Sequence, residues 1–119
     1  MTIEECYSLM QGDYADALKR LMKDQLIERF VLNFPKDDSM QQLRDATAAG
    51  IQNDAFRAAH TLKGVAANLS LTKLAVSASN LTEQLRSGEQ MPDPELLAEV
   101  EKDYALVINT LAKYAEEKE

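Results

Sequence analysis

The chain has 119 residues, of which 45% are hydrophobic and 6% aromatic, with 13 Lys and Arg against 20 Asp and Glu. This composition predicts a single folded domain over residues 1–119, and the net charge of −7 argues against a nucleic-acid partner. One cysteine excludes an internal disulfide, and no apolar run approaches the length of a membrane span, so we expect a cytoplasmic protein with no membrane contact.

The first part of the chain, residues 2–34, has the pattern of short helices. Thr2 and Glu5 are spaced as a capping box, which predicts a first helix that stops near Gly12. Asp13 is expected to cap a second helix. A third ends before Pro35, although the weak break between the second and third leaves open one bent helix. The expected inward stripes are Tyr14, Leu18, Leu21 and Met22, followed by Leu26, Ile27, Phe30, Val31 and Phe34.

The pattern of residues 38–118 predicts four longer helices. Ser39 and Gln42 are spaced as a second capping box that opens the first of these helices, and Gly50 ends it. Asn53 or Asp54 starts the second. The positions of the first helix that we expect to face inward are Met40, Leu43 and either Ala46 or Thr47.

The last two helices follow short connections. Ser70 and Thr72 are expected to end one helix and cap the next with a very short turn, which makes the two helices antiparallel neighbours. Gly88 ends the third helix, and Asp93 with Pro94 opens the fourth. The expected buried positions are Leu74, Ala78, Leu81 and Leu85, then Leu97, Val100, Tyr104, Val107, Leu111 and Tyr114.

No stretch alternates as a strand would, so the predicted fold class is all-α. Residues 38–118 form an antiparallel up-and-down four-helix bundle, and the additional N-terminal helices of residues 2–34 cover one end or side of it.

The only histidine, His60, lies on the outer face of the second bundle helix. At 3.6 residues per turn it lies roughly opposite a broad apolar arc that the bundle would bury. That arc consists of Ala55, Ala58, Ala59, Leu62, Ala66 and Leu69, whereas the neighbours of His60 are Arg57 one turn before, Lys63 and Gly64 one turn after, and Ala67 two turns after.

Gly64 is the unusual neighbour, because a glycine inside a helix costs about 0.5–1 kcal/mol relative to alanine. It either gives clearance to an approaching partner or permits close helix packing, and its outward position favours clearance. An imidazole is a nucleophile near neutral pH. Lys63 is placed to offset part of the charge of a phosphoryl group on His60.

The run His60-Thr61-Leu62-Lys63-Gly64, preceded by Ala58-Ala59 and followed by small residues, resembles the histidine-containing phosphotransfer (HPt) domain family. The resemblance covers residues 55–88 and ends at Leu85-Arg86-Ser87-Gly88. It implies a phosphorelay intermediate that accepts a phosphoryl group on His60 from a receiver-domain aspartate or a (hybrid) histidine kinase and passes it to another receiver. The residues that we expect to contact a partner are Lys63, Gly64, Arg57, Ala67 and Asn68.

Two positions depart from the family pattern. Ser70 stands where a glycine is usual, which is expected to affect only the turn between helices. Thr82 stands where a Glu or Gln often holds the histidine ring, so the group that orients the ring is left open, with Glu83 and Gln84 expected to point elsewhere. Phe56, one turn before His60, is either covered by an N-terminal helix or exposed in a docking patch.

The sequence lacks the residue patterns that common classes of enzyme need for metal or nucleotide binding. One His and one Cys make no zinc cluster, and neither a Glu-x-x-His motif nor a glycine-rich phosphate loop occurs. We therefore expect a monomeric phosphoryl carrier that is not an enzyme, without a cofactor or metal of its own. The resemblance implies that the receiver brings Mg²⁺ and its acidic pocket. The alternative is a helical adaptor that binds a receiver without accepting phosphate.

Overall fold

The computed structural model describes residues 1–118. It is entirely helical over these residues, with no strand, which confirms the all-α class. The elements are α1 (Ile3–Leu9), α2 (Tyr14–Leu21), α3 (Asp24–Asn33), the 3₁₀ helix η1 (Phe34–Lys36), α4 (Ser39–Ala49), α5 (Gln52–Asn68), α6 (Thr72–Leu85) and α7 (Pro94–Lys118). Among these residues, no helix is both long enough and apolar enough to span a bilayer.

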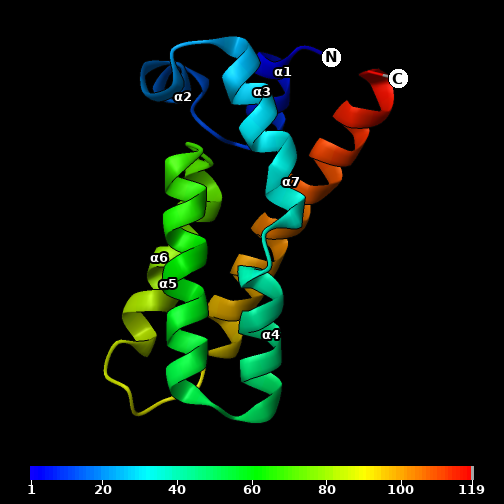
Figure 1. The fold of residues 1–119 in the computed structure, drawn as a ribbon. Helices are drawn as coiled ribbons and strands as arrows, with labels where there is room; N and C mark the ends of the chain where they lie inside the picture. Colours follow the sequence, from blue (N-terminus) through cyan, green and yellow to red (C-terminus); the bar gives the residue numbers. More distant parts are fainter. Residues whose placement is uncertain (119) are drawn as a thin grey trace.

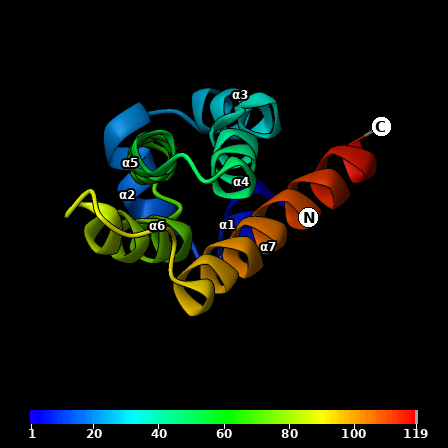
Figure 2. The ribbon, with the colours of Figure 1, turned by 90° about the horizontal axis from the view of Figure 1, so that it is seen from below.

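Helices α4 to α7 form the bundle, each running antiparallel to the one before it (Figure 1). Viewed along its axis, the four helices surround a common centre (Figure 2). This centre is filled by aliphatic side chains from every helix, such as Leu43, Leu62, Leu81 and Val107, all with no exposed surface. Helix α7 extends beyond the other three, and α1 and α3 lie along the extension, so the N-terminal helices are an addition at one end of the bundle.

Local side-chain chemistry explains the starts of α1, α2 and α7. Thr2 and Glu5 form the predicted capping box of α1, and Asp13 caps α2 by accepting from the backbone N–H of Asp16. Asp93 accepts from the backbone N–H groups of Glu95 and Leu96 in the first turn of α7. These caps were all predicted, because each satisfies backbone donors that a helix start leaves free.

The predicted capping box of α4 was wrong. Ser39 is already helical, and its backbone N–H and its hydroxyl both donate to the carboxylate of Asp37. Gly50, in the left-handed conformation, ends α4 as expected. Helix α5 begins at Gln52, before the predicted Asn53 or Asp54.

The turn between α5 and α6 is as short as predicted but is built differently. Leu71, and not Thr72, is the N-cap of α6, and Ser70 has a φ of 57° in the left-handed region. The start of the chain holds this turn: Tyr7 donates to the Leu69 carbonyl (2.8 Å), and the Ser70 hydroxyl donates to Asp16 (2.7 Å). The C-terminal end of α5 is therefore fixed by residues that precede the bundle.

The inward stripes of the first helices were partly wrong. Helices α2 and α3 are separate, with Met22 between them at a φ of 68°. Leu18, Met22 and Phe30 are 38%, 79% and 45% exposed, so they do not enter the core, whereas Ala17 is the buried residue of α2. Helix α6 also ends earlier than predicted, at Leu85 instead of Gly88.

Candidate functional site

His60 lies at the middle of α5 and its side chain is exposed. The opposite side of the helix carries Ala59, Leu62 and Ala66, which are buried in the bundle, so the helical period directs the imidazole into solvent. Within residues 1–118, neither ring nitrogen of His60 takes part in a hydrogen bond to a side chain or backbone group. The ring is therefore accessible to solvent, and neither nitrogen is occupied by a hydrogen bond within the described residues.

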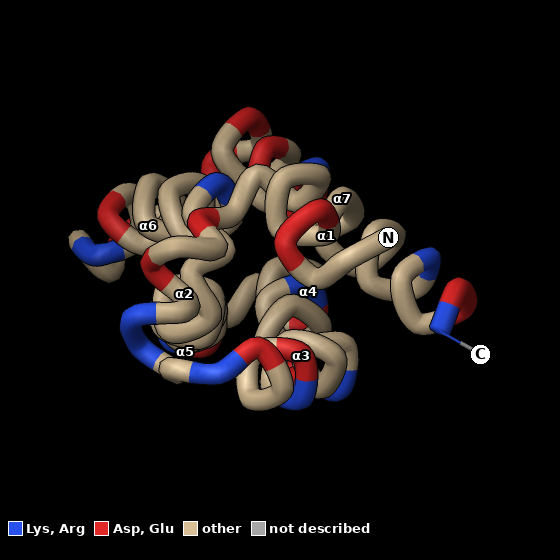
Figure 3. The backbone as a smooth tube through the Cα atoms, turned by 90° about the horizontal axis from the view of Figure 1, so that it is seen from above, with Lys and Arg blue, Asp and Glu red and all other residues tan. Residues whose placement is uncertain are grey.

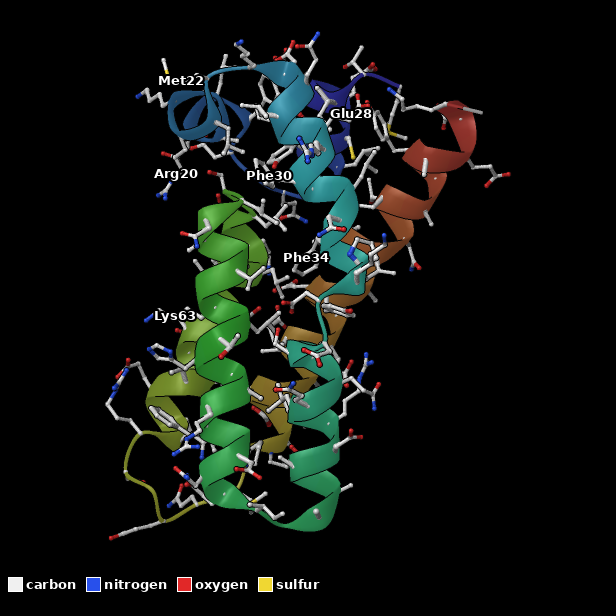
Figure 4. The ribbon with its side chains drawn as sticks, in the orientation of Figure 1. Arg20, Met22, Glu28, Phe30, Phe34 and Lys63 are labelled. Atoms are coloured by element: carbon white, nitrogen blue, oxygen red, sulfur yellow. The ribbon has the colours of Figure 1, made fainter. Side chains whose placement is uncertain are left out.

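The space beside the imidazole is open on the C-terminal side. A Cβ atom added at Gly64 would meet no heavy atom within 4 Å beyond the backbone of its own helix. Gly64 therefore does not serve close helix packing. Lys63 is half-buried and forms no ion pair within the described part of the chain, and Figure 4 shows it at the side of α5. Its ammonium group is available to a negative charge placed on the neighbouring ring.

The other side of the imidazole meets α6 through an aromatic ring. The centroids of the Phe56 and His60 rings are 6.1 Å apart, with 42° between the ring planes. The guanidinium carbon of Arg86 lies 5.5 Å from the centroid of the Phe56 ring, and Arg86 is bound to Glu83 through hydrogen bonds of 3.0 and 2.8 Å. Phe56 is half-buried against the core, so its ring is neither fully covered nor fully exposed.

Neither Phe56 nor Arg86 was among the site residues predicted from the sequence. Arg86 follows α6 and Phe56 belongs to α5, so no spacing rule within one helix could bring them together. The signal for Arg86 was its place in the Leu85–Gly88 ending of the segment that resembles the family, and the signal for Phe56 was its position one turn before His60, which made a docking patch one of two alternatives.

Thr82 does not bind the imidazole. It is buried, and its hydroxyl donates to the carbonyl of Ala78 (2.7 Å). Gln84 points away, as predicted, because its amide contacts the loop before α7. Glu83 lies closer to the site than expected: the hydrogen bond from Arg86 lowers the pKa of its carboxyl, and the charges of Lys63 and His60 lower it further.

On the side away from α6, two hollows flank the outer face of α5. One lies between α5 and the α3–η1 segment and is lined by Phe30, Phe34, Val65 and Asn68, among others. Figure 4 shows Phe30 and Phe34 on the α3–η1 segment beside α5. The second lies between α4 and α5 and includes Arg57 in its lining. The predicted residues Arg57 and Asn68 are therefore exposed at the edges of these hollows, whereas Ala67 is half-buried.

Positive charge gathers near one end of α5, although the protein is acidic overall. Lys19 and Arg20 end α2 and Lys23 lies in the turn to α3, and this basic stretch lies over the C-terminal end of α5 (Figures 1 and 3). Arg20 pairs with Asp16 at 3.0 Å.

Other nucleophilic or metal-binding chemistry has little support in the described residues. No group of three His, Cys, Asp or Glu side chains in residues 1–118 is arranged to hold a metal ion. Cys6 is buried, and this burial raises the pKa of its thiol to about 11, which keeps it in the unreactive protonated form.

The described residues form an antiparallel helical bundle with one exposed histidine on α5. A family model described as the Hpt domain matches residues 25–110, which is well over half of the chain. The chain belongs to the Hpt domain family, and it is a phosphotransfer module of two-component signalling. The match begins in α3, so α1 and α2 lie outside it. No curated protein and no solved structure matches the chain.

Proposed function

We propose that this protein is a phosphorelay intermediate that accepts a phosphoryl group on His60 from a receiver-domain aspartate or a hybrid histidine kinase and passes it to another receiver. The observation that carries the proposal is an exposed imidazole without a hydrogen-bond partner in residues 1–118, next to the open space at Gly64. A receiver must bring its phosphorylated aspartate within bonding distance of this ring, and nothing in the described chain lies over Gly64.

The transfer step requires little from this chain. An unprotonated ring nitrogen of His60 attacks the phosphorus of an aspartyl phosphate. The P–N bond forms as the P–O bond to the aspartate breaks, and the carboxylate leaves. The reverse step passes the group to the next receiver. Phosphoryl transfer depends on positioning and on charge stabilisation by metal ions and cations. We infer that the receiver supplies Mg²⁺ and that this protein is a carrier, not an enzyme.

Lys63, Arg57 and Arg86 are the cations around the ring. The phosphoryl group adds about two negative charges, which these side chains offset in part. Because an exposed charge pair contributes only about 0–1 kcal/mol, Lys63 should assist and not be essential. A folded Lys63→Ala protein that takes up no phosphate at all would contradict this role.

We also propose that the receiver docks on the outer face of α5 and on the hollow beside α3. Asn68 and Val65 connect the two surfaces, since both line the hollow and Val65 follows Gly64 directly. Phe30 offers a large apolar side chain at the edge of this hollow and is 45% exposed. Aromatic side chains in such positions are common anchors of protein–protein interfaces. Ala67 contributes to the same surface, and its small side chain keeps the approach open.

The test is transfer from purified phosphorylated receivers of the same genome to the full chain, with acid-labile phosphate as the measure. Wild type should exchange phosphate rapidly with at least one receiver, whereas His60→Gln should take up none and keep its melting temperature, because surface substitutions cost within about 0.5 kcal/mol. Receiver binding without phosphate uptake by wild type would favour the adaptor alternative. We further propose that the protein acts as a monomer in the cytoplasm, which size-exclusion chromatography and cell fractionation test.

A further inference from the structure

No hydrogen bond within the described residues orients the His60 ring. In residues 1–118, the imidazole accepts no hydrogen bond from α6 and donates none to it. Thr82 faces the interior, where it binds the Ala78 carbonyl, and the carboxylate of Glu83 is bound to Arg86. An exposed imidazole held by nothing would rotate between rotamers, and each transfer would then need the ring to be found in the correct orientation.

The Phe56 ring packs beside the imidazole. Phe56 and His60 are one helical turn apart, so their side chains lie on the same face of α5. The centroid separation of 6.1 Å and the tilt of 42° fall in the range in which aromatic rings attract each other. Phe56 is itself half-buried against the core, which makes it a firm surface for a neighbouring ring.

Phe56 is held in turn from the end of α6. The guanidinium of Arg86 lies over its ring at 5.5 Å, a cation–π contact. The same guanidinium donates two hydrogen bonds to Glu83, and both side chains of this pair are about half exposed. Arg86, Phe56 and His60 therefore form a row that runs from the end of α6 to the reactive ring, and the same three side chains line one hollow on the surface.

We propose that Phe56 is a positioning residue for His60: it restrains the imidazole by ring contact, and Arg86 holds Phe56 in place. This inference rests on the proposed function for its purpose. Ring contact differs from a hydrogen bond in one measurable way. A hydrogen-bond acceptor on one ring nitrogen fixes the tautomer, whereas contact with Phe56 restrains the orientation and leaves both tautomers accessible.

The experiment compares Phe56→Leu with Phe56→Tyr, and uses Tyr14→Leu as the matched control. Tyr14 is a half-buried ring that packs on Tyr7 in the N-terminal helices. Transfer from a phosphorylated receiver is measured over a range of receiver concentrations, together with His60 labelling by phosphoramidate. Loss of the ring contact should lower the maximal transfer rate about twofold to tenfold and leave the half-saturating receiver concentration unchanged.

Phe56→Tyr should transfer at the wild-type rate, because it keeps the ring. Phosphoramidate labelling should fall in Phe56→Leu by the same factor as receiver transfer, and Tyr14→Leu should change neither. A Phe56→Leu protein with the wild-type maximal rate, or one in which only the half-saturating concentration changes, would overturn the proposal.

NMR of the one imidazole provides a readout that needs no phosphate. In wild type, the His60 ring protons should carry ring-current shifts and nuclear Overhauser contacts from Phe56. Both should weaken in Arg86→Gln, which keeps Phe56 and so remains informative if Phe56→Leu fails to fold. Absence of the contacts in wild type refutes the ring restraint, whereas contacts in a protein that accepts no phosphate refute the proposed function alone.

Discussion

Replacing Gly64 by Gln should make the protein more stable and a poorer phosphate carrier. The residue is helical, it is exposed, and a Cβ atom added there meets no heavy atom within 4 Å beyond its own helix backbone. The substitution therefore introduces no clash and no backbone strain. What remains is helix propensity, and Gln is a far better helix former than Gly.

The stability gain follows from that difference. Gly costs about 0.8–1.0 kcal/mol relative to Ala inside a helix, and Gln lies close to Ala, so unfolding should require up to about 1 kcal/mol more. For a chain of this size such a gain raises the melting temperature by about 2–5 °C. The side chain of a helical residue leans toward the preceding turn, so the introduced glutamine side chain would cover the approach to His60.

Two measurements on one variant test this reasoning: thermal unfolding and receiver-to-His60 transfer. Transfer should fall at least tenfold, as about 1.4 kcal/mol of hindrance would produce. Gly64→Ala is the matched control, since it gains the same helix propensity and should retain most of the transfer. A destabilised Gly64→Gln protein, or a stable one that relays normally, would show that Gly64 is not a clearance for docking.

Three further perturbations test the surroundings of the site. Gly12→Ala should destabilise the fold by about 1–3 kcal/mol, because its Cβ would lie 2.9 Å from the Ser70 carbonyl oxygen and from the Tyr7 ring, and an unchanged denaturation midpoint would contradict this. Ser70→Ala should lower stability at neutral pH. The Ser70 hydroxyl holds the pKa of Asp16 below its ordinary value, so that stabilisation is present above about pH 4 and is lost as pH falls through the folded pKa. Urea unfolding at several pH values should therefore show the two proteins converging in acid, and a constant gap would count against the hydrogen bond. Phe30→Asp should raise the half-saturating receiver concentration about tenfold without changing phosphoramidate labelling, and an unaltered half-saturation would remove Phe30 from the docking surface.

The outer position of His60 could be predicted because it depends on one helix alone. The apolar arc of α5 fixes which side is buried, and the helical period then places every other residue. Caps such as Thr2, Asp13 and Asp93 were equally local, since each side chain binds backbone groups within three residues.

The errors arose where two elements meet. Leu18, Met22 and Phe30 continue apolar stripes, but no helix of residues 1–118 covers them fully, and periodicity does not reveal whether a neighbour exists. At the start of α4, Asp37 and Ser39 are both competent caps. Because η1 ends at Lys36, Asp37 lies directly after it, and its carboxylate accepts from the backbone N–H of Ser39.

The contacts between helices at the site could not be predicted from the sequence either. Arg86 reaches Phe56 only because α5 and α6 are antiparallel and in a particular register. The Ser70 turn shows the same limit, since its hydroxyl binds Asp16 from a helix that lies outside the family match. A pattern within one helix carries no information about such register.

The most direct test of the central claim uses the fact that the chain contains one histidine. Nitrogen-15 and phosphorus-31 NMR of the labelled protein, recorded before and after addition of a phosphorylated receiver, observe a single imidazole. We expect a new phosphoramidate signal, together with a shift of one ring nitrogen of His60. Phosphate that appears on the protein while both ring nitrogens keep their original shifts would contradict this claim.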